Sequence, residues 1–108
     1  MSLNRYDTRR DENEPEIMAA LRGCGLSVYA ADKPLDLIVG HNGLTELAEV
    51  KMPRNKRGDP KPYTPAQEVF LGDWTGGHTL LVTVDDALNM AARMKAKSRL
   101  LRDMGVSK

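Results

Sequence analysis

The segment over residues 35–51, LDLIVGHNGLTELAEVK, constrains the fold more than any other part of the chain. Two runs rich in aliphatic residues flank Asn42-Gly43. Asn-Gly is the strongest short-range signal for a β-hairpin, because both central residues of a type I′ turn need a positive φ. A two-residue turn also fixes how the strands pair, so that Ile38 faces Leu47. The sequence therefore predicts an antiparallel hairpin of defined register.

Continued to the open end of the hairpin, this register places two carboxylates, Asp36 and Glu49, opposite each other. Opposed residues have Cβ atoms about 4.5–5.5 Å apart, and two facing anions are destabilising unless a cation compensates them. Lys51 follows Glu49 by two positions, so the pleat sends its ammonium group to the same face. Ile38 and Leu47 share that face, which indicates partial shielding from water. We therefore expect a cluster of two carboxylates and one lysine.

Helix and strand signals flank the hairpin on both sides. A helix over residues 14–24 is expected after Asn13, an N-cap type residue, and a short strand is expected over 26–30. On the other side, Thr64 begins a capping box, which predicts a second helix that runs to about Trp74. The hairpin is thus expected to sit between helical segments.

The C-terminal part continues this alternation. Residues 78–84 predict a buried strand, and Asp85 would cap a last helix. The apolar stripe of that helix would consist of Leu88, Ala91, Met94, Ser98 and Leu101. The order α-β-β-β-α-β-α predicts a single α/β domain over 13–108 with a mixed four-stranded sheet. Residues 1–12 are polar and lack a period, so they are expected to form a flexible arm.

These features together resemble the PD-(D/E)xK nuclease superfamily. The motif is present as Pro34-Leu35-Asp36, then twelve residues, then Glu49-Val50-Lys51, and the likeness covers nearly the whole chain. The proline lies two positions before the aspartate, whereas the superfamily name implies adjacent residues. The basic loop and the helix that follow look like virus-type replication-repair nuclease (VRR-NUC) domains. The resemblance implies a restriction-endonuclease-like αβββαβ core with an extra C-terminal helix.

The resemblance also implies an activity and a metal. It implies a divalent-metal-dependent endonuclease that hydrolyses phosphodiester bonds in DNA, selective for branched DNA or Holliday junctions in phage or bacterial replication and repair. Asp36, Glu49 and the backbone carbonyl of Val50 would hold Mg²⁺ or Mn²⁺, both of which prefer hard oxygen ligands. Lys51 would orient or deprotonate the attacking water, or would steady the charge of the transition state. The residues leave this choice open.

Two further positions are candidates for the same site. Gln67 resembles the family's helix glutamine, which hydrogen-bonds water or phosphate near the metal, although its place in the capping box explains it equally well. Glu16 or Glu14 would add a carboxylate from the first helix. At about 100° per residue only one of them can face the site, and we favour Glu16, beside the apolar Ile17.

The charge distribution points to a surface for nucleic acid. The formal net charge is only +1, but the loop over residues 52–63 is rich in basic side chains beside the expected metal site. We expect this loop to extend the phosphate-binding surface and DNA to be the partner. The basic residues of the last helix are interpreted as a solvated face over an apolar dimer stripe. The loop residues assigned to DNA binding are Arg54, Lys56, Arg57 and Lys61.

The remaining composition excludes several classes. A lone cysteine, Cys24, excludes a disulfide framework and a cysteine zinc cluster, and indicates a reducing, intracellular compartment. The resemblance implies that this compartment is the cytoplasm of a bacterium or of a phage-infected cell. No apolar run approaches the ~20 residues that span a bilayer, so no membrane is expected. A chain of this size buries only about two-thirds of its surface, which favours a homodimer. The alternative function is a catalytically inactive DNA-binding or assembly module with a nuclease fold.

Overall fold

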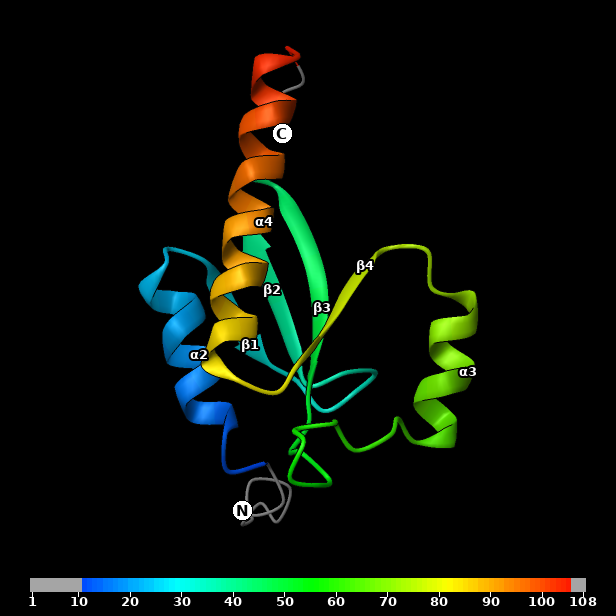
Figure 1. Cartoon of the computed structure of the whole chain (residues 1–108). Coiled ribbons are helices and arrows are strands. Elements are labelled where there is room, and N and C mark those ends of the chain that lie inside the picture. The colour runs from blue at the N-terminus through cyan, green and yellow to red at the C-terminus, as the bar shows by residue number, and fades with distance from the viewer. Residues whose placement is uncertain (1–10, 106–108) are drawn as a thin grey trace, which may run out of the picture.

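The computed structural model describes residues 11–105 (Figure 1). Its elements follow the predicted order α-β-β-β-α-β-α. The arm predicted over residues 1–12 lies outside the described residues except for Asp11 and Glu12. In chain order the elements are α2 (Glu14–Gly23), β1 (Ser27–Ala30), β2 (Leu37–His41), β3 (Leu44–Val50), α3 (Pro65–Asp73), β4 (Gly77–Leu81) and α4 (Val84–Asp103).

The four strands form one mixed sheet in the order β1-β2-β3-β4. The first three are antiparallel, and β4 runs parallel to β3 after the α3 crossover. Ile38 pairs with Leu47 as predicted. Asn42 and Gly43 have φ values of 49° and 86°, as a type I′ turn requires. The predicted fold class, α/β with a mixed four-stranded sheet and an additional C-terminal helix, is confirmed.

Helices α2 and α4 cover one face of the sheet (Figure 1). The core between them contains Ile17 and Leu21 of α2, Met90 and Met94 of α4, and inward-facing residues of the strands such as Val39. Because side chains alternate along a strand, Ile38, Leu47 and Glu49 point to the opposite face. Helix α3 stands beyond the β4 edge, and none of its residues is buried. The sheet therefore has one face packed on helices and one face that carries the predicted cluster.

The start of α4 differs from the sequence-based expectation. Thr83, not Asp85, is the N-cap: its side chain accepts a hydrogen bond from the Asp86 N–H, and the Asp86 carboxylate accepts one from the Thr83 N–H. This capping box ends the extended segment at Leu81 rather than at residue 84. The buried stripe consists of Ala87, Met90, Ala91, Met94 and Ser98, whereas Leu88 is exposed. The interpretation of this stripe as a dimer surface is therefore wrong, because its apolar residues pack into the core of the chain itself. No helix within residues 11–105 is long and apolar enough to cross a membrane.

Asn13 does not cap α2 with its side chain. Its Nδ2 instead donates hydrogen bonds to the carbonyl of Lys51 at 3.2 Å and to the carbonyl of Val82 at 2.6 Å. Both carbonyls lie one residue beyond Val50 and Leu81, the last paired residues of β3 and β4. The amide therefore joins the N-terminus of α2 to the ends of two parallel strands.

We expect Asn13→Ala to lower the free energy of unfolding by about 2 kcal/mol, since it removes two hydrogen bonds worth about 1 kcal/mol each. The melting temperature should fall by roughly 8–15 °C in a domain of this size. Asn13→Asp keeps the shape but turns acceptor oxygens toward two carbonyls, so it should destabilise at least as much. Calorimetry checks both, with exposed Asn89→Ala as the control; equal melting temperatures for Asn13→Ala and Asn89→Ala would contradict this role.

Candidate active site

Asp36 and Glu49 are joined by hydrogen bonds at the open end of the hairpin. The backbone N–H of Asp36 donates to Oε1 of Glu49 at 3.1 Å. In return, Oδ2 of Asp36 accepts a hydrogen bond from the backbone N–H of Val50 at 3.0 Å. Each carboxylate is thus held by the backbone of the strand that carries the other, which offsets part of their mutual repulsion. The predicted juxtaposition of these two carboxylates is present in the structure.

Lys51 supplies the counter-ion that this arrangement requires. Its Nζ lies 3.3 Å from Oε2 of Glu49, and the side chains of Lys51 and Glu49 are only 13% and 5% exposed. An ion pair removed from water stabilises a structure only when further hydrogen bonds satisfy its remaining polar groups. Oε1 of Glu49 meets this condition through the Asp36 N–H. Glu49 and Lys51 share a face because they are two positions apart at the end of β3, whereas Asp36 lies in the bend just before β2 and joins them through its hydrogen bonds.

Gln67 meets the same ammonium group from helix α3. Its Oε1 accepts hydrogen bonds from Nζ of Lys51 at 3.3 Å and from the backbone N–H of Thr64 at 3.0 Å. The Thr64 side chain accepts the reciprocal bond from the Gln67 N–H, which completes the predicted capping box. One oxygen atom therefore serves both the helix cap and the site. The capping-box explanation for Gln67 is confirmed, and the contact with Lys51 places Gln67 beside the carboxylate pair.

Tyr63 is part of the site and was not anticipated from the sequence. Nζ of Lys51 lies 5.9 Å from the centroid of the Tyr63 ring, within the range of a cation–π contact. Burial raises the pKa of Tyr63, and the negative charge of Glu49 raises it further. The available signal was its position directly before the helix cap, at the end of a loop that starts beside Lys51.

Helix α3 is fastened to the sheet near both ends. At its N-terminus the contact runs through Gln67 and Lys51. Past its C-terminus, Trp74 stacks on Phe70 with ring centroids 5.3 Å apart and donates from Nε1 to the carbonyl of Gly77. A Cβ atom added to Gly76 would lie 2.5 Å from the Trp74 ring, so only glycine fits under the indole. Because no residue of α3 is buried, these contacts set its distance from the site.

Val50 lies between the two charged residues of the motif and is itself buried. Its N–H points toward Asp36 on the β2 side of the strand. Within a strand the N–H and C=O of one residue point to the same side, so the Val50 carbonyl also faces the Asp36 side. The backbone N–H of Lys51 points to the opposite side of the strand and donates to the carbonyl of Leu81. The Val50 carbonyl therefore lies on the side of β3 that faces Asp36.

The preference for Glu16 over Glu14 is not supported. Glu14 is 2% exposed, whereas Glu16 is exposed. The reason is helical phase: Glu14 lies three residues before Ile17 and shares its buried face, while a residue adjacent to Ile17 is turned away by about 100°. Among residues 11–105 no group of three or more His, Cys, Asp or Glu side chains is arranged to hold a metal ion. Asp36 and Glu49 therefore form a pair without a third acidic partner of this kind among the described residues.

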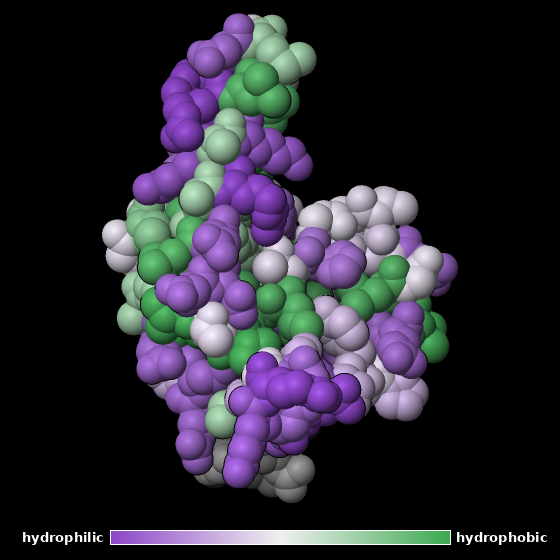
Figure 2. All heavy atoms as spheres, viewed as in Figure 1, coloured by the Kyte–Doolittle hydropathy of each residue, from purple (hydrophilic) through white to green (hydrophobic). Residues whose placement is uncertain are grey.

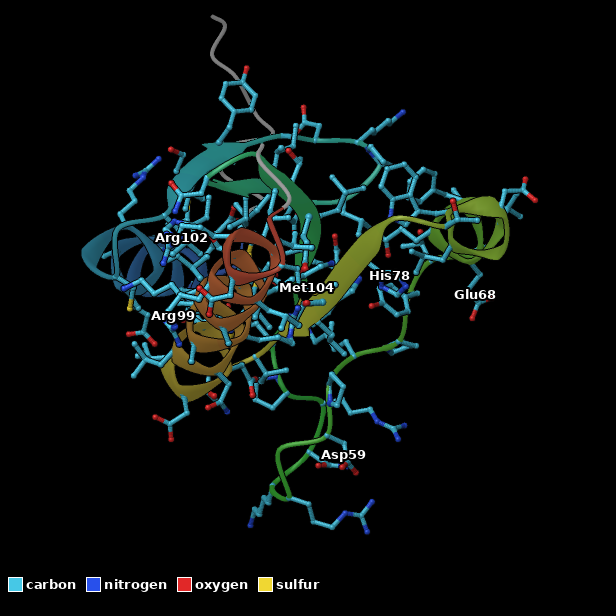
Figure 3. All side chains as sticks on the ribbon, turned by 90° about the horizontal axis from the view of Figure 1, so that it is seen from above. Asp59, Glu68, His78, Arg99, Arg102 and Met104 are labelled. Atoms are coloured by element: carbon cyan, nitrogen blue, oxygen red, sulfur yellow. The ribbon has the colours of Figure 1, made fainter. Side chains whose placement is uncertain are left out.

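The basic loop extends from the end of β3 and away from the sheet, with Asp59 far from the body (Figure 3). Its two arms meet in a bridge between Pro53 and Pro60. Asp59 accepts hydrogen bonds from Asn55 and Arg57, and these two bonds lower its pKa. The Arg57–Asp59 pair has a distance of 3.0 Å and is exposed. Within residues 11–105, the other three basic residues assigned to DNA form no ion pair: Arg54, Lys56 and Lys61.

Comparisons with known proteins give no relative for this chain: no family model, no curated protein and no solved structure matches it.

Proposed function

We propose that the chain is a divalent-metal-dependent DNA endonuclease of the PD-(D/E)xK type, similar to the VRR-NUC domains. The observation that carries this proposal is the contact group of Asp36, Glu49 and Lys51 at one end of the sheet. Residues distant in sequence come together there with the composition that phosphodiester hydrolysis needs: two hard anionic ligands and one cationic side chain.

The donor set fits Mg²⁺ or Mn²⁺. Asp36, Glu49 and the Val50 carbonyl would hold the ion, with water and substrate phosphate completing its shell. Mg²⁺ commonly binds through one or two carboxylates together with substrate phosphates, so a third acid is not required. When bound, the ion polarises the phosphate and activates water for attack. Within residues 11–105, neither Glu14 nor Glu16 joins Asp36 and Glu49 in a group of three acidic ligands, so the proposed ion is held without a carboxylate from α2.

The remaining residues orient the reacting groups. Lys51 has three donors on its ammonium group, which in the described structure meet Glu49 and Gln67. From this position Lys51 would hydrogen-bond the attacking water or an oxygen of the scissile phosphate. Gln67 holds the ammonium from α3 and would meet water or phosphate at the edge of the site.

DNA would lie along the loop over residues 52–63, which leaves the body at the same end of β3 as the site (Figure 1). Branched DNA as the substrate, and a bacterial or phage-infected cytoplasm as the location, follow from the VRR-NUC resemblance. The decisive experiment is a cleavage assay with Mg²⁺ and with Mn²⁺ on four-way junctions, flaps and linear duplexes. Cleavage that EDTA stops supports an endonuclease, whereas salt-sensitive binding without cleavage identifies an inactive DNA-binding module.

We also propose a homodimer. The C-terminal half of α4 projects past the sheet (Figure 1), and green apolar surface gathers at its tip (Figure 2). Leu100 and Met104 are 58% and 65% exposed there. A second copy of the chain would cover these side chains, as apolar surface of this kind favours association. Sedimentation velocity measures the mass in solution, and a monomer at all concentrations contradicts the dimer.

We expect replacement of Arg54, Lys56 and Arg57 by Ala to weaken DNA binding uniformly across sequences. The slope of log K against log salt should flatten by up to about 0.9 for each phosphate group that the variant no longer neutralises. The change in slope should be smaller than the change expected for three lost phosphate contacts, because Arg57 is already paired with Asp59.

The matched control removes the same charge from α4, whose C-terminal half lies at the opposite end of the molecule from the loop: Lys97, Arg99 and Arg102 to Ala. Because these residues lie near the proposed dimer contact, sedimentation velocity must first show that this variant keeps the wild-type mass. Fluorescence anisotropy over a range of salt concentrations measures both slopes. Equal slopes for the loop variant and the wild type would make the loop a solvated connector.

A further inference from the structure

The ammonium group of Lys51 is enclosed by three side chains from two parts of the chain. Glu49 lies beside it on β3, at 3.3 Å. Gln67 approaches from the first turn of α3, also at 3.3 Å, and the ring of Tyr63 lies on a further side, with its centroid 5.9 Å away. As a result, only 13% of the Lys51 side chain is exposed.

The three contacts do not survive metal binding equally. This step rests on the proposed function, in which Glu49 is a ligand of the cation. With its carboxylate engaged by an ion, Glu49 would be a weaker partner for Lys51, and the ammonium would also be repelled by the positive charge. A lysine ammonium is strongly hydrated and sits on a flexible four-carbon stem, so it moves unless other contacts hold it. Only Tyr63 and Gln67 then remain from the enclosure.

We propose that Tyr63 is a positioning residue, whose ring face holds the Lys51 ammonium at the reacting phosphate when Glu49 binds the metal ion. The ring is well placed for this task because Thr64, the next residue, is fixed by the capping box of α3. Tyr63 is therefore anchored to the same helix turn that carries Gln67. The Tyr63 ring and the Gln67 side chain are thus fixed relative to each other, and together they hold Nζ of Lys51 in one position.

The face of the ring, not its hydroxyl group, makes the contact. Within residues 11–105 the Tyr63 hydroxyl has no hydrogen-bond partner, while the ring approaches Nζ within cation–π range. Burial raises the pKa of Tyr63, so the phenol stays neutral at physiological pH and adds no competing anion. Phenylalanine at position 63 should therefore retain the positioning role, whereas an aliphatic side chain of similar bulk should lose it.

The test compares Tyr63→Phe with Tyr63→Leu, using Mn²⁺ and a four-way DNA junction as the probe. Tyr63→Phe should keep kcat within about 2-fold of the wild type. Tyr63→Leu should lower kcat by a factor of roughly 3 to 30, the range that one cation–π contact accounts for, with KM unchanged. Tyr29→Leu is the matched control: it removes a tyrosine that is 68% exposed on β1, and kcat should not change.

A second measurement does not depend on cleavage. In the metal-free protein, the ring current of Tyr63 should shift the Lys51 ε-CH₂ resonances upfield; this shift should persist in Tyr63→Phe and disappear in Tyr63→Leu. Wild-type kcat in Tyr63→Leu, or an equal loss in Tyr63→Phe, would overturn the proposal. If the wild type cleaves no DNA, the proposed nuclease function fails, and the Lys51 resonances still decide whether Tyr63 holds the ammonium.

Discussion

Asp36→Asn should abolish divalent-dependent cleavage and leave the metal-free protein at least as stable as the wild type. The loss should exceed about 10³-fold, since a bound ion stabilises the transition state by several kcal/mol. An asparagine oxygen can still accept the hydrogen bond from Val50, so the local structure is retained. At the same time the substitution removes the negative charge of Asp36, which relieves its repulsion with Glu49 in the absence of metal.

Two measurements check this expectation together. Cleavage of a labelled four-way junction is followed over a Mn²⁺ titration, and thermal unfolding is followed in EDTA. Asp73→Asn is the control, because Asp73 is an exposed carboxylate at the end of α3, away from the hairpin. It should leave both readouts unchanged. If Asp36→Asn unfolds the chain but leaves its affinity for Mn²⁺ intact, the two carboxylates do not share a cation.

Lys51→Ala should lower turnover by a factor on the order of 10²–10⁴, the usual contribution of a general base or positioning group. Because Lys51 neutralises buried Glu49, the substitution should also lower the metal-free free energy of unfolding by about 1–3 kcal/mol. Mg²⁺ would supply the missing positive charge. The melting temperature of Lys51→Ala should therefore rise more on addition of Mg²⁺ than that of the wild type.

Lys51→Arg separates the two roles left open for this residue. Arginine keeps the positive charge but cannot be deprotonated at ordinary pH. Substantial cleavage by Lys51→Arg would identify an electrostatic contact with the phosphate. Inactivity equal to that of Lys51→Ala, with Mn²⁺ and DNA binding retained, would favour the base. Wild-type rates in Lys51→Ala would contradict any role of Lys51 in turnover.

The hairpin and its charged cluster could be predicted because they depend on local rules. Asn42-Gly43 sets the turn, and the turn sets the register as far as the pair Leu37 and Ala48. The residues just beyond this pair, Asp36 and Glu49, are thereby brought together and joined by a hydrogen bond. The side of Lys51 then follows from strand alternation. The same register pairs Val39 with Glu46, and Val39 is in the core.

The ion-pair partner of Glu46 could not be predicted from the strand register alone. It is 5% exposed on the helix-covered face, where Arg93 of α4 donates to both of its carboxylate oxygens at 3.1 Å. Burial of a carboxylate requires such a partner, but the register does not say which basic side chain supplies it. Arg93 is 47 positions away, so the pair depends on how α4 packs across the sheet.

The other differences also arise from contacts between distant segments. Asn13 is of a residue type that often caps helices, but its side-chain amide donates to the carbonyls that follow two strands. Only the folded chain brings these carbonyls close to Asn13. The choice between Glu14 and Glu16 is the exception: the spacing of Glu14 from Ile17 and Leu21 along α2 already places Glu14 on the buried face. Tyr63 reaches Lys51 only because the loop returns to the point where it began, with Lys61 donating its N–H to the carbonyl of Met52.

We propose that Asp36 and Glu49 hold one catalytic cation beside Lys51. The initial rate of four-way junction cleavage, measured as a function of Mg²⁺ concentration in parallel for the wild type and Glu49→Gln, tests this proposal. We expect a saturable, Mg²⁺-dependent rate for the wild type and a rate at least about 10³-fold lower for Glu49→Gln. Equal rates for the two proteins, or DNA binding without cleavage by the wild type with either Mg²⁺ or Mn²⁺, would contradict it.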